Sequence, residues 1–172
     1  MAANDILVIG VGNEFRSDDG LGIHIVRELR RRVSTNVRLV EQSGEGTSLM
    51  ETWKGVPHVF IVDAVVSNGN PGALHRVDVR RDGLPRHLFR SSSHTFGVAE
   101  AVALSRQLGT LPATLILYGI EIESAEPGSG LSAPVVCAVP DLLHALQHDI
   151  ELLMPGGIIA EPFTDQGGVS SR

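Results

Sequence analysis

A glycine-rich turn near the N-terminus constrains the fold of this chain more than any other feature. Residues Ile6–Ile9 form a short apolar run that ends at Gly10 and Gly12, and from about Leu21 to Arg31 apolar residues recur at helical spacing. The turn therefore joins a buried strand to a helix, as in the first crossover of an open α/β sheet. Glycines allow the tight turning that such a crossover needs. Because ligands of these folds bind at the carboxyl ends of the strands, the turn is also a candidate binding site.

A dinucleotide site is the first interpretation that this position suggests, but the residues in the turn argue against it. The fingerprint Gly-x-Gly-x-x-Gly has Phe15 in place of its third glycine. The acids Glu14, Asp18 and Asp19 would repel a pyrophosphate. Glu41, at the end of the next strand, can mimic a ribose-binding acid, so nucleotide binding stays open as a minor alternative. Asp18 and Asp19 are explained mainly as acids that cap the following helix or favour its positive end.

The rest of the chain alternates between apolar runs and helical patterns. Ser132 can cap the last helix, whereas Pro140 would break or kink a helix begun there, so its start is left open between the two. These patterns predict an α/β fold, a three-layer doubly wound sandwich of about five mostly parallel strands with helices on both faces. We expect residues 1–155 to form a single domain and residues 156–172 to form a flexible C-terminal tail. Later strands are predicted at 37–40, 59–62, 73–79 (a candidate edge strand) and 114–120, and helices at 97–108 and up to 153.

The composition narrows the class of protein. A hydrophobic fraction of 42% is typical of a globular chain, and the net charge of −6 argues against nucleic acid as the main partner. Cys137 is the single cysteine, which fits a reducing compartment, and its apolar neighbours predict a buried thiol. We find neither a signal peptide nor an apolar stretch of membrane-spanning length, so the expected location is the cytoplasm, away from membranes.

Three potential metal ligands follow different elements of the predicted fold. Glu14 follows the first strand and Asp63 ends the third, and these two strands are neighbours if the sheet has the flavodoxin-like order. His94 lies just before the helix predicted from Gly97, where the helix dipole favours the neutral imidazole that coordinates a metal. Two carboxylates and one imidazole suit nickel, zinc, manganese or iron, and they leave coordination positions open for water or substrate.

Other constellations in the sequence are weaker. His144 and His148 have the i, i+4 spacing of a helical metal pair, but they lie on the polar side of an apolar stripe and no HExxH glutamate accompanies them. No Gly-x-Ser-x-Gly elbow supports a serine hydrolase. A basic segment ahead of His94 can steer an acidic partner, although exposed arginines need no function. It contains Arg80, Arg81, Arg86, His87 and Arg90.

The order of these motifs resembles that of the hydrogenase maturation endopeptidases, which trim the C-terminus of the large subunit of nickel-iron hydrogenases. The resemblance covers most of the chain. The chain differs from the family in Ser43–Thr47, where the usual turn is Asp-Gly-Gly-Thr, and Glu45 is a candidate replacement for its acid. The similarity rests on Gly10–Glu14, Asp18–Gly22, Asp63-Ala64, Ser92–His94, Gly119-Ile120 and Leu131-Ser132.

The resemblance implies an endopeptidase that acts on the precursor of a hydrogenase large subunit, as a monomer. It carries catalytic and nickel-recognition roles onto Glu14, Asp63 and His94. The nickel is supplied by the substrate, so that cleavage reports metal insertion, and zinc or other divalent metals can occupy the site in vitro. A nickel-binding recognition module or chaperone that does not cut the precursor is the alternative.

Overall fold

The computed structural model describes residues 5–33, 36–85, 88 and 96–154. Its centre is a five-stranded sheet with the strand order β2-β1-β3-β5-β4. Four strands are parallel, and β4 is an antiparallel edge strand paired with β5. The strands are β1 (Ile6–Val11), β2 (Val37–Gln42), β3 (His58–Val65), β4 (Leu74–Asp78) and β5 (Thr114–Glu121).

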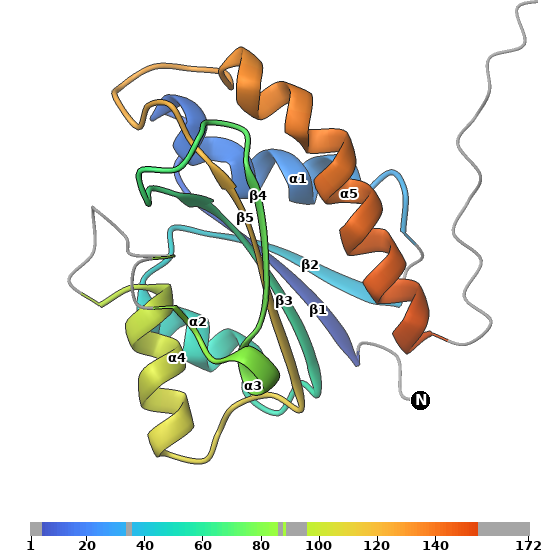
Figure 1. Cartoon of the computed structure of the whole chain (residues 1–172). Coiled ribbons are helices and arrows are strands. Elements are labelled where there is room, and N and C mark those ends of the chain that lie inside the picture. The colour runs from blue at the N-terminus through green and yellow to red at the C-terminus, as the bar shows by residue number, and fades with distance from the viewer. Residues whose placement is uncertain (1–4, 34–35, 86–87, 89–95, 155–172) are drawn as a thin grey trace, which may run out of the picture.

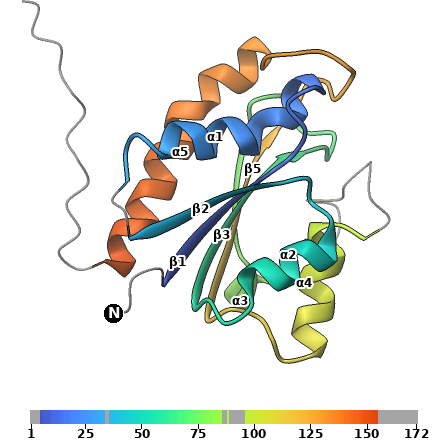
Figure 2. The same ribbon diagram turned by 180° about the vertical axis from the view of Figure 1, so that it is seen from behind.

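Helices cover both faces of this sheet and make three layers (Figures 1 and 2). Helices α1 and α5 lie on one face, while α2 and α4 lie on the other, with the short α3 beside them. The predicted fold class is therefore confirmed, as are the neighbouring first and third strands and the fourth strand at an edge. The helices are η1 (Ser17–Gly20, a 3-10 turn), α1 (Leu21–Leu29), α2 (Gly46–Trp53), α3 (Val79–Asp82), α4 (Val98–Gln107) and α5 (Ala133–Leu153).

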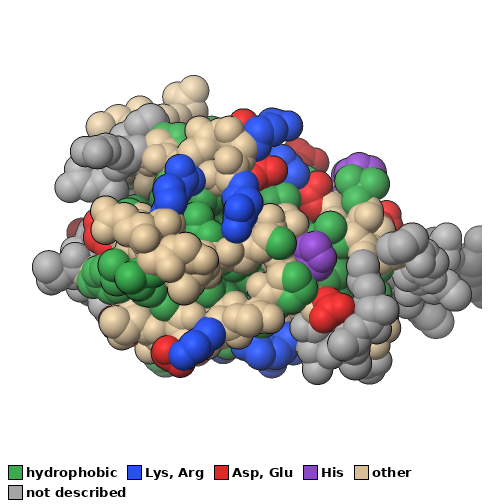
Figure 3. Space-filling model, turned by 90° about the horizontal axis from the view of Figure 1, so that it is seen from below, with side chains coloured by type: hydrophobic (Ala, Val, Ile, Leu, Met, Phe, Trp, Pro, Cys, Tyr) green, Lys and Arg blue, Asp and Glu red, His purple; other side chains and the backbone are tan. Residues whose placement is uncertain are grey.

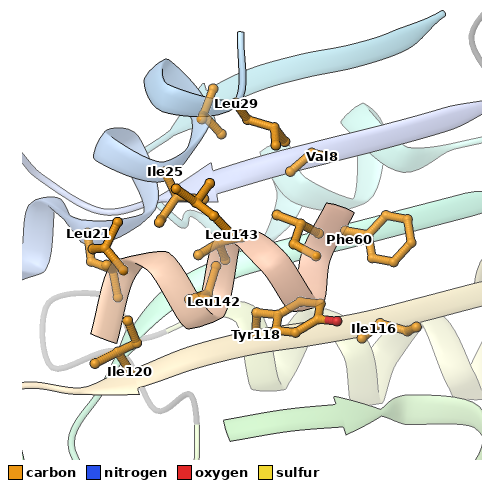
Figure 4. Close-up of a cluster of buried hydrophobic side chains, with 14 of the residues drawn as sticks. Val8, Leu21, Ile25, Leu29, Phe60, Ile116, Tyr118, Ile120, Leu142 and Leu143 are labelled. Carbon is orange, nitrogen blue, oxygen red and sulfur yellow. The ribbon is translucent and has the colours of Figure 1, made fainter. Parts of the chain in front are cut away.

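Two apolar cores follow from the alternation of side chains along the strands. Successive strand residues point to opposite faces, so that Val8 packs against α1 and α5 while its neighbour Ile9 packs against α2 and α4. Figure 4 shows the first of these cores, in which Leu21 and Ile25 of α1 meet Leu142 of α5 above the sheet. Because both faces are covered, the central strands are mostly apolar, as the continuous runs of the sequence predicted.

The helix α5 settles the question that the sequence left open. It begins at Ala133 with Ser132 at its N-cap, and Pro140 lies inside a continuous helix. Pro140 is exposed, on the side away from the sheet, and the buried stripe on the other side holds the helix in place. The loss of one backbone hydrogen bond at a proline is thus outweighed by packing. The tail predicted at 156–172 lies outside the described residues.

Two further features concern the surface. None of the helices in the described part of the chain combines the length and the apolarity that crossing a bilayer requires. On the face shown in Figure 3, Lys and Arg side chains lie among acidic and apolar ones and form no continuous basic surface within the described residues.

Candidate active site

The carboxyl ends of β1 and β3 lie side by side, and the start of α1 rests directly on them. A Cβ atom on Gly22 would lie 2.3 Å from the carbonyl oxygen of Val11 and 2.4 Å from that of Val62, so no other residue fits there. Gly10 is equally constrained, because its Cβ would lie 2.1 Å from the oxygen of Gly22. The glycines of the opening motif therefore serve close packing of helix on strand, and they bring η1 to the edge of the sheet near Asp63.

Asp63 lies inside β3, although the sequence predicted it directly after the strand. It pairs with Gly119 of β5, and the ladder continues to Val65. By strand alternation its side chain shares a face with Ile61 and Val65, which is the face that α2 and α4 cover. Only 7% of Asp63 is exposed. A carboxylate is therefore buried at the edge where ligands of this fold class bind.

Burial changes the acidity of Asp63. Loss of solvent raises its pKa to about 8 and the nearby charge of Asp19 adds to this, while a 2.8 Å hydrogen bond from the Ala64 N–H to Oδ1 acts in the opposite direction. Within the described part of the chain, no Lys, Arg or His side chain pairs with this carboxyl group. A buried acid in this state needs a proton or a cation.

Asp19 is the residue whose importance the sequence reasoning missed. Arg16 occupies the N-cap of η1 and Gly20 that of α1, so Asp18 does not hold the capping position that was one of the predicted explanations, although Asp18 and Asp19 both lie in the first turn of η1. Asp19 instead lies close enough to Asp63 to raise its pKa. In the sequence, Asp19 was marked only as the second acid of the pair Asp18-Asp19. We had explained both acids by their effect on the start of the following helix.

Asp18 has a structural role. It is fully buried, and its carboxylate accepts hydrogen bonds from the N–H groups of Glu123, Ser124 and Ser132 and from the Ser132 hydroxyl, at 2.6 to 3.3 Å. These bonds fasten η1 to the segment that leads into α5. They also occupy the Ser132 hydroxyl, which makes no capping bond to its own helix.

Glu14, the first predicted ligand, points to a different partner. Its carboxylate forms a two-pronged ion pair with Arg27 of α1, with N–O distances of 2.7 and 3.2 Å, and 47% of its side chain is exposed. Arg27 also contacts Glu41. The hydrogen bond and the positive charge of Arg27 lower the pKa of Glu14. Glu14 is therefore ionised and already paired with a cation, and no contact among the described residues joins it to Asp63.

His94, the third predicted ligand, lies outside the described residues. Phe96, two positions later in the sequence, packs against the core of the α2 and α4 face, and its carbonyl oxygen accepts a 2.9 Å bond from the Gly46 N–H. In the described part of the chain, no three His, Cys, Asp or Glu side chains come together as a metal site. The oxygen atoms of the Asp63 carboxyl group are of the donor type that divalent metals take.

Other candidates from the sequence are also placed by the structure. Glu45 caps α2, accepting hydrogen bonds from Thr47 and Ser48, which lower its pKa to about 2. Cys137 is exposed, so the prediction of a buried thiol is wrong. The buried stripe of α5 contains its neighbours Val135 and Ala138 but not Cys137 itself. His144 and His148 are exposed on α5, as expected of a solvated face.

The comparisons with known proteins agree with this fold. A family model described as hydrogenase maturation protease matches residues 23–148. The chain belongs to this family. It is 32% identical over 162 residues to the hydrogenase 2 maturation protease of Escherichia coli K12, an alignment that covers 91% of this chain and 95% of that protein. It is 33% identical over 165 residues to the hydrogenase expression/formation protein HoxM of Azotobacter vinelandii, and this alignment covers 93% of this chain and 77% of that protein.

A solved structure gives the same result. The hydrogenase maturating endopeptidase HybD from E. coli matches with a TM-score of 0.77 and 26% identity, over 90% of this chain and 97% of that one. The resemblance drawn from the sequence motifs is thus confirmed, and so is the enzyme class. As a hydrogenase maturation protease, the chain is an endopeptidase that acts in the maturation of a hydrogenase.

Proposed function

We propose that this protease removes a C-terminal peptide from the nickel-loaded precursor of a nickel-iron hydrogenase large subunit, and that nickel in the substrate is the signal it recognises. The observation that carries the proposal is the buried carboxyl group of Asp63, next to a second acid, Asp19, at the carboxyl end of the sheet. A nickel ion carried by the precursor supplies a cation to the buried carboxyl group of Asp63.

The acidity of Asp63 makes the site selective for a metal that arrives with the substrate. With a pKa of about 8, Asp63 holds its proton at neutral pH. A metal must displace that proton before the carboxylate can coordinate it, so binding of free metal is weakened. Contact between the precursor and the protease supplies additional binding free energy, which a free ion does not have.

Asp63 and His94 are the proposed ligands of the nickel, together with one acid from the segment after β1. Asp19 and Glu14 are the two candidates for that acid. The electrostatic contact with Asp63 favours Asp19, whereas Glu14 would first have to leave Arg27. An ion pair at such an exposed position contributes little free energy, so its loss would not prevent Glu14 from binding the metal. Glu14 is therefore tested as the alternative ligand.

The catalytic chemistry follows from where the nickel would be held. Nickel bound to both substrate and protease fixes the adjacent peptide bond against the edge of the sheet, and it can polarise the carbonyl group or acidify a water molecule. A carboxylate of the site that is not bound to metal can act as the general base toward that water. The same groups would accept zinc or another divalent metal in vitro.

We further propose that the protease works as a cytoplasmic monomer on one precursor. Light scattering of the mixture would then show a complex of one protease chain and one precursor chain.

Mass spectrometry of the nickel-loaded precursor, before and after incubation, tests the ligand set. The wild type is expected to release a C-terminal peptide, and Asp63→Asn and His94→Ala are expected to release none while keeping the fold. Loss of cleavage in Asp19→Asn but not in Glu14→Gln would assign the third ligand to Asp19, and the reverse pattern would assign it to Glu14. Normal cleavage by Asp63→Asn, or a stable uncut complex with the wild type, would contradict the proposal.

A further inference from the structure

Phe15 presents an aromatic side chain to solvent at the edge of the sheet where Asp63 lies. The residue belongs to the loop between β1 and η1 and is 74% exposed, the highest value among the large apolar residues that the structure describes. An aromatic side chain in water contributes little to the core, and most of its surface stays available for burial against a partner. Single exposed apolar residues are common in proteins, so the significance of Phe15 depends on its support and its position.

The loop that carries Phe15 is closed on itself and fastened to a neighbouring segment. The Asn13 N–H donates to the carbonyl oxygen of Asp19 at 3.2 Å, and the Asp19 N–H donates to that of Arg16 at 3.0 Å. The N–H of Phe15 donates to Asn13 Oδ1 at 3.0 Å, and its carbonyl oxygen accepts a 3.0 Å bond from the Gly128 N–H. Both backbone groups of Phe15 are therefore bonded before any partner arrives, so that its burial would cost little chain entropy.

The position of this loop connects Phe15 with the acid site. The loop ends at Asp19, whose charge acts on Asp63. A second exposed apolar residue, Val66, follows β3 directly, three positions after Asp63, and is 60% exposed. Figures 1 and 2 both show η1 and the connection from β3 to β4 at the same end of the sheet. Exposed apolar side chains thus accompany the acids on two of the segments that form the site.

We infer that Phe15 is a docking residue for an apolar patch on the precursor of the hydrogenase large subunit, with Val66 as a second contact. The inference rests on the proposed function, because nickel held at Asp63 brings the precursor to this edge of the sheet. Aromatic residues are enriched where proteins meet. An apolar contact also supplies the binding free energy that distinguishes a precursor from a free nickel ion, which the acids alone do not supply.

Three substitutions separate docking from a structural role. Phe15→Ser removes the ring, whereas Phe15→Leu keeps an apolar side chain on the same loop. Leu152→Ser is the matched control: Leu152 is 69% exposed, but it lies near the end of α5, a helix of 21 residues that extends roughly 30 Å from its start at the site. Since the ring is exposed in the free protein, docking predicts an unchanged melting temperature for Phe15→Ser. A melting temperature that falls together with activity would indicate a structural role and overturn the inference.

The experiment measures initial rates of cleavage over a range of concentrations of the nickel-loaded precursor. For Phe15→Ser we expect a KM about 10 times higher or more with kcat nearly unchanged, as for an apolar contact that is equally strong in ground and transition states. Val66→Ser is expected to raise KM about 2 to 5 times, because valine is smaller. Phe15→Leu should stay within about 3 times the wild-type KM, and Leu152→Ser should match it. A wild-type KM for Phe15→Ser, or an equal rise for Leu152→Ser, would overturn the inference.

A second copy of this chain is the other partner that an exposed ring could bind. Light scattering of the protease alone distinguishes the two partners, and we expect a monomer for both the wild type and Phe15→Ser. A wild-type dimer that Phe15→Ser dissociates would assign the ring to self-association and overturn the inference.

Asp63→Asn in the same cleavage assay keeps this test distinct from that of the proposed function. If Asp63→Asn cleaves normally, the proposed function fails, whatever Phe15 does. If Asp63→Asn is inactive and Phe15→Ser has the wild-type KM, only the inference about Phe15 fails.

Discussion

Replacing Asp63 with Asn is expected to stabilise the protein at neutral and alkaline pH, even though it abolishes cleavage. Asn has nearly the same shape, and its Oδ1 can still accept the bond from the Ala64 N–H. It carries no charge that burial could penalise. The free energy of unfolding therefore reports the cost of holding this acid in the site.

The size of the effect follows from the two pKa values. The ordinary pKa of the side chain is 3.8, and burial raises it to about 8 in the folded protein. Between these pH values the folded protein binds a proton that the unfolded chain has released, so the wild type loses stability as the pH rises. Each unit of difference corresponds to about 1.4 kcal/mol. The advantage of Asp63→Asn should be small near pH 4, grow by about 1.4 kcal/mol per pH unit, and level off above pH 8 at roughly 6 kcal/mol.

Urea unfolding between pH 4.5 and 9 measures this difference without added metal. Trp53 is the single tryptophan and is buried, so its fluorescence reports global unfolding. Asp141→Asn, at an exposed position of α5, is the matched control and should change stability by less than about 0.5 kcal/mol. A stability difference between Asp63→Asn and the wild type that does not grow with pH, or that favours the wild type at pH 8, would refute the reasoning.

Three further predictions concern the supports of the site. Asp18→Ala should destabilise the fold by about 2 to 4 kcal/mol in urea, because four hydrogen-bond donors lose their acceptor; unchanged hydrogen exchange at the Ser124 and Ser132 amides would contradict this. Gly22→Ala should lower the free energy of unfolding by about 3 kcal/mol or more in the same assay, because the added Cβ would collide with two carbonyl oxygens. A urea midpoint equal to that of the wild type would contradict this and show that α1 can move aside. Glu45→Ala should lower the melting temperature by about 1 to 3 °C through loss of the α2 cap, whereas Glu45→Gln should retain most of it.

The layers of this protein were predictable because they depend on apolar patterns that local sequence records. The strand order was predictable only in part: the neighbouring first and third strands and the edge position of the fourth were expected, but the place of β5 between β3 and an antiparallel β4 was not. The limits of the elements were harder to predict. The apolar run ends at Val62, but β3 continues to Val65 because its partner β5 extends alongside it. The eight-residue α2 was missed, since only Leu49 and Trp53 mark its buried side and its cap is a glutamate.

In the site, some residues could be identified from the local sequence and others only from the tertiary structure. Asp63 stood out because a carboxylate at the end of an apolar strand has few local explanations. Asp18 and Asp19 had a good local explanation, the start of a helix, and the structure gives them different tertiary roles. Only the packing of η1 against the 123–132 segment and β3 separates the structural Asp18 from the Asp19 that acts on Asp63.

The most direct test of the central claim compares the same precursor with and without nickel. Each form is incubated with the wild-type protease, and the mass of the large subunit is measured over time. We predict loss of a C-terminal peptide from the nickel-loaded precursor only, with the nickel-free form left intact. Equal cleavage of both forms would contradict nickel recognition by this site.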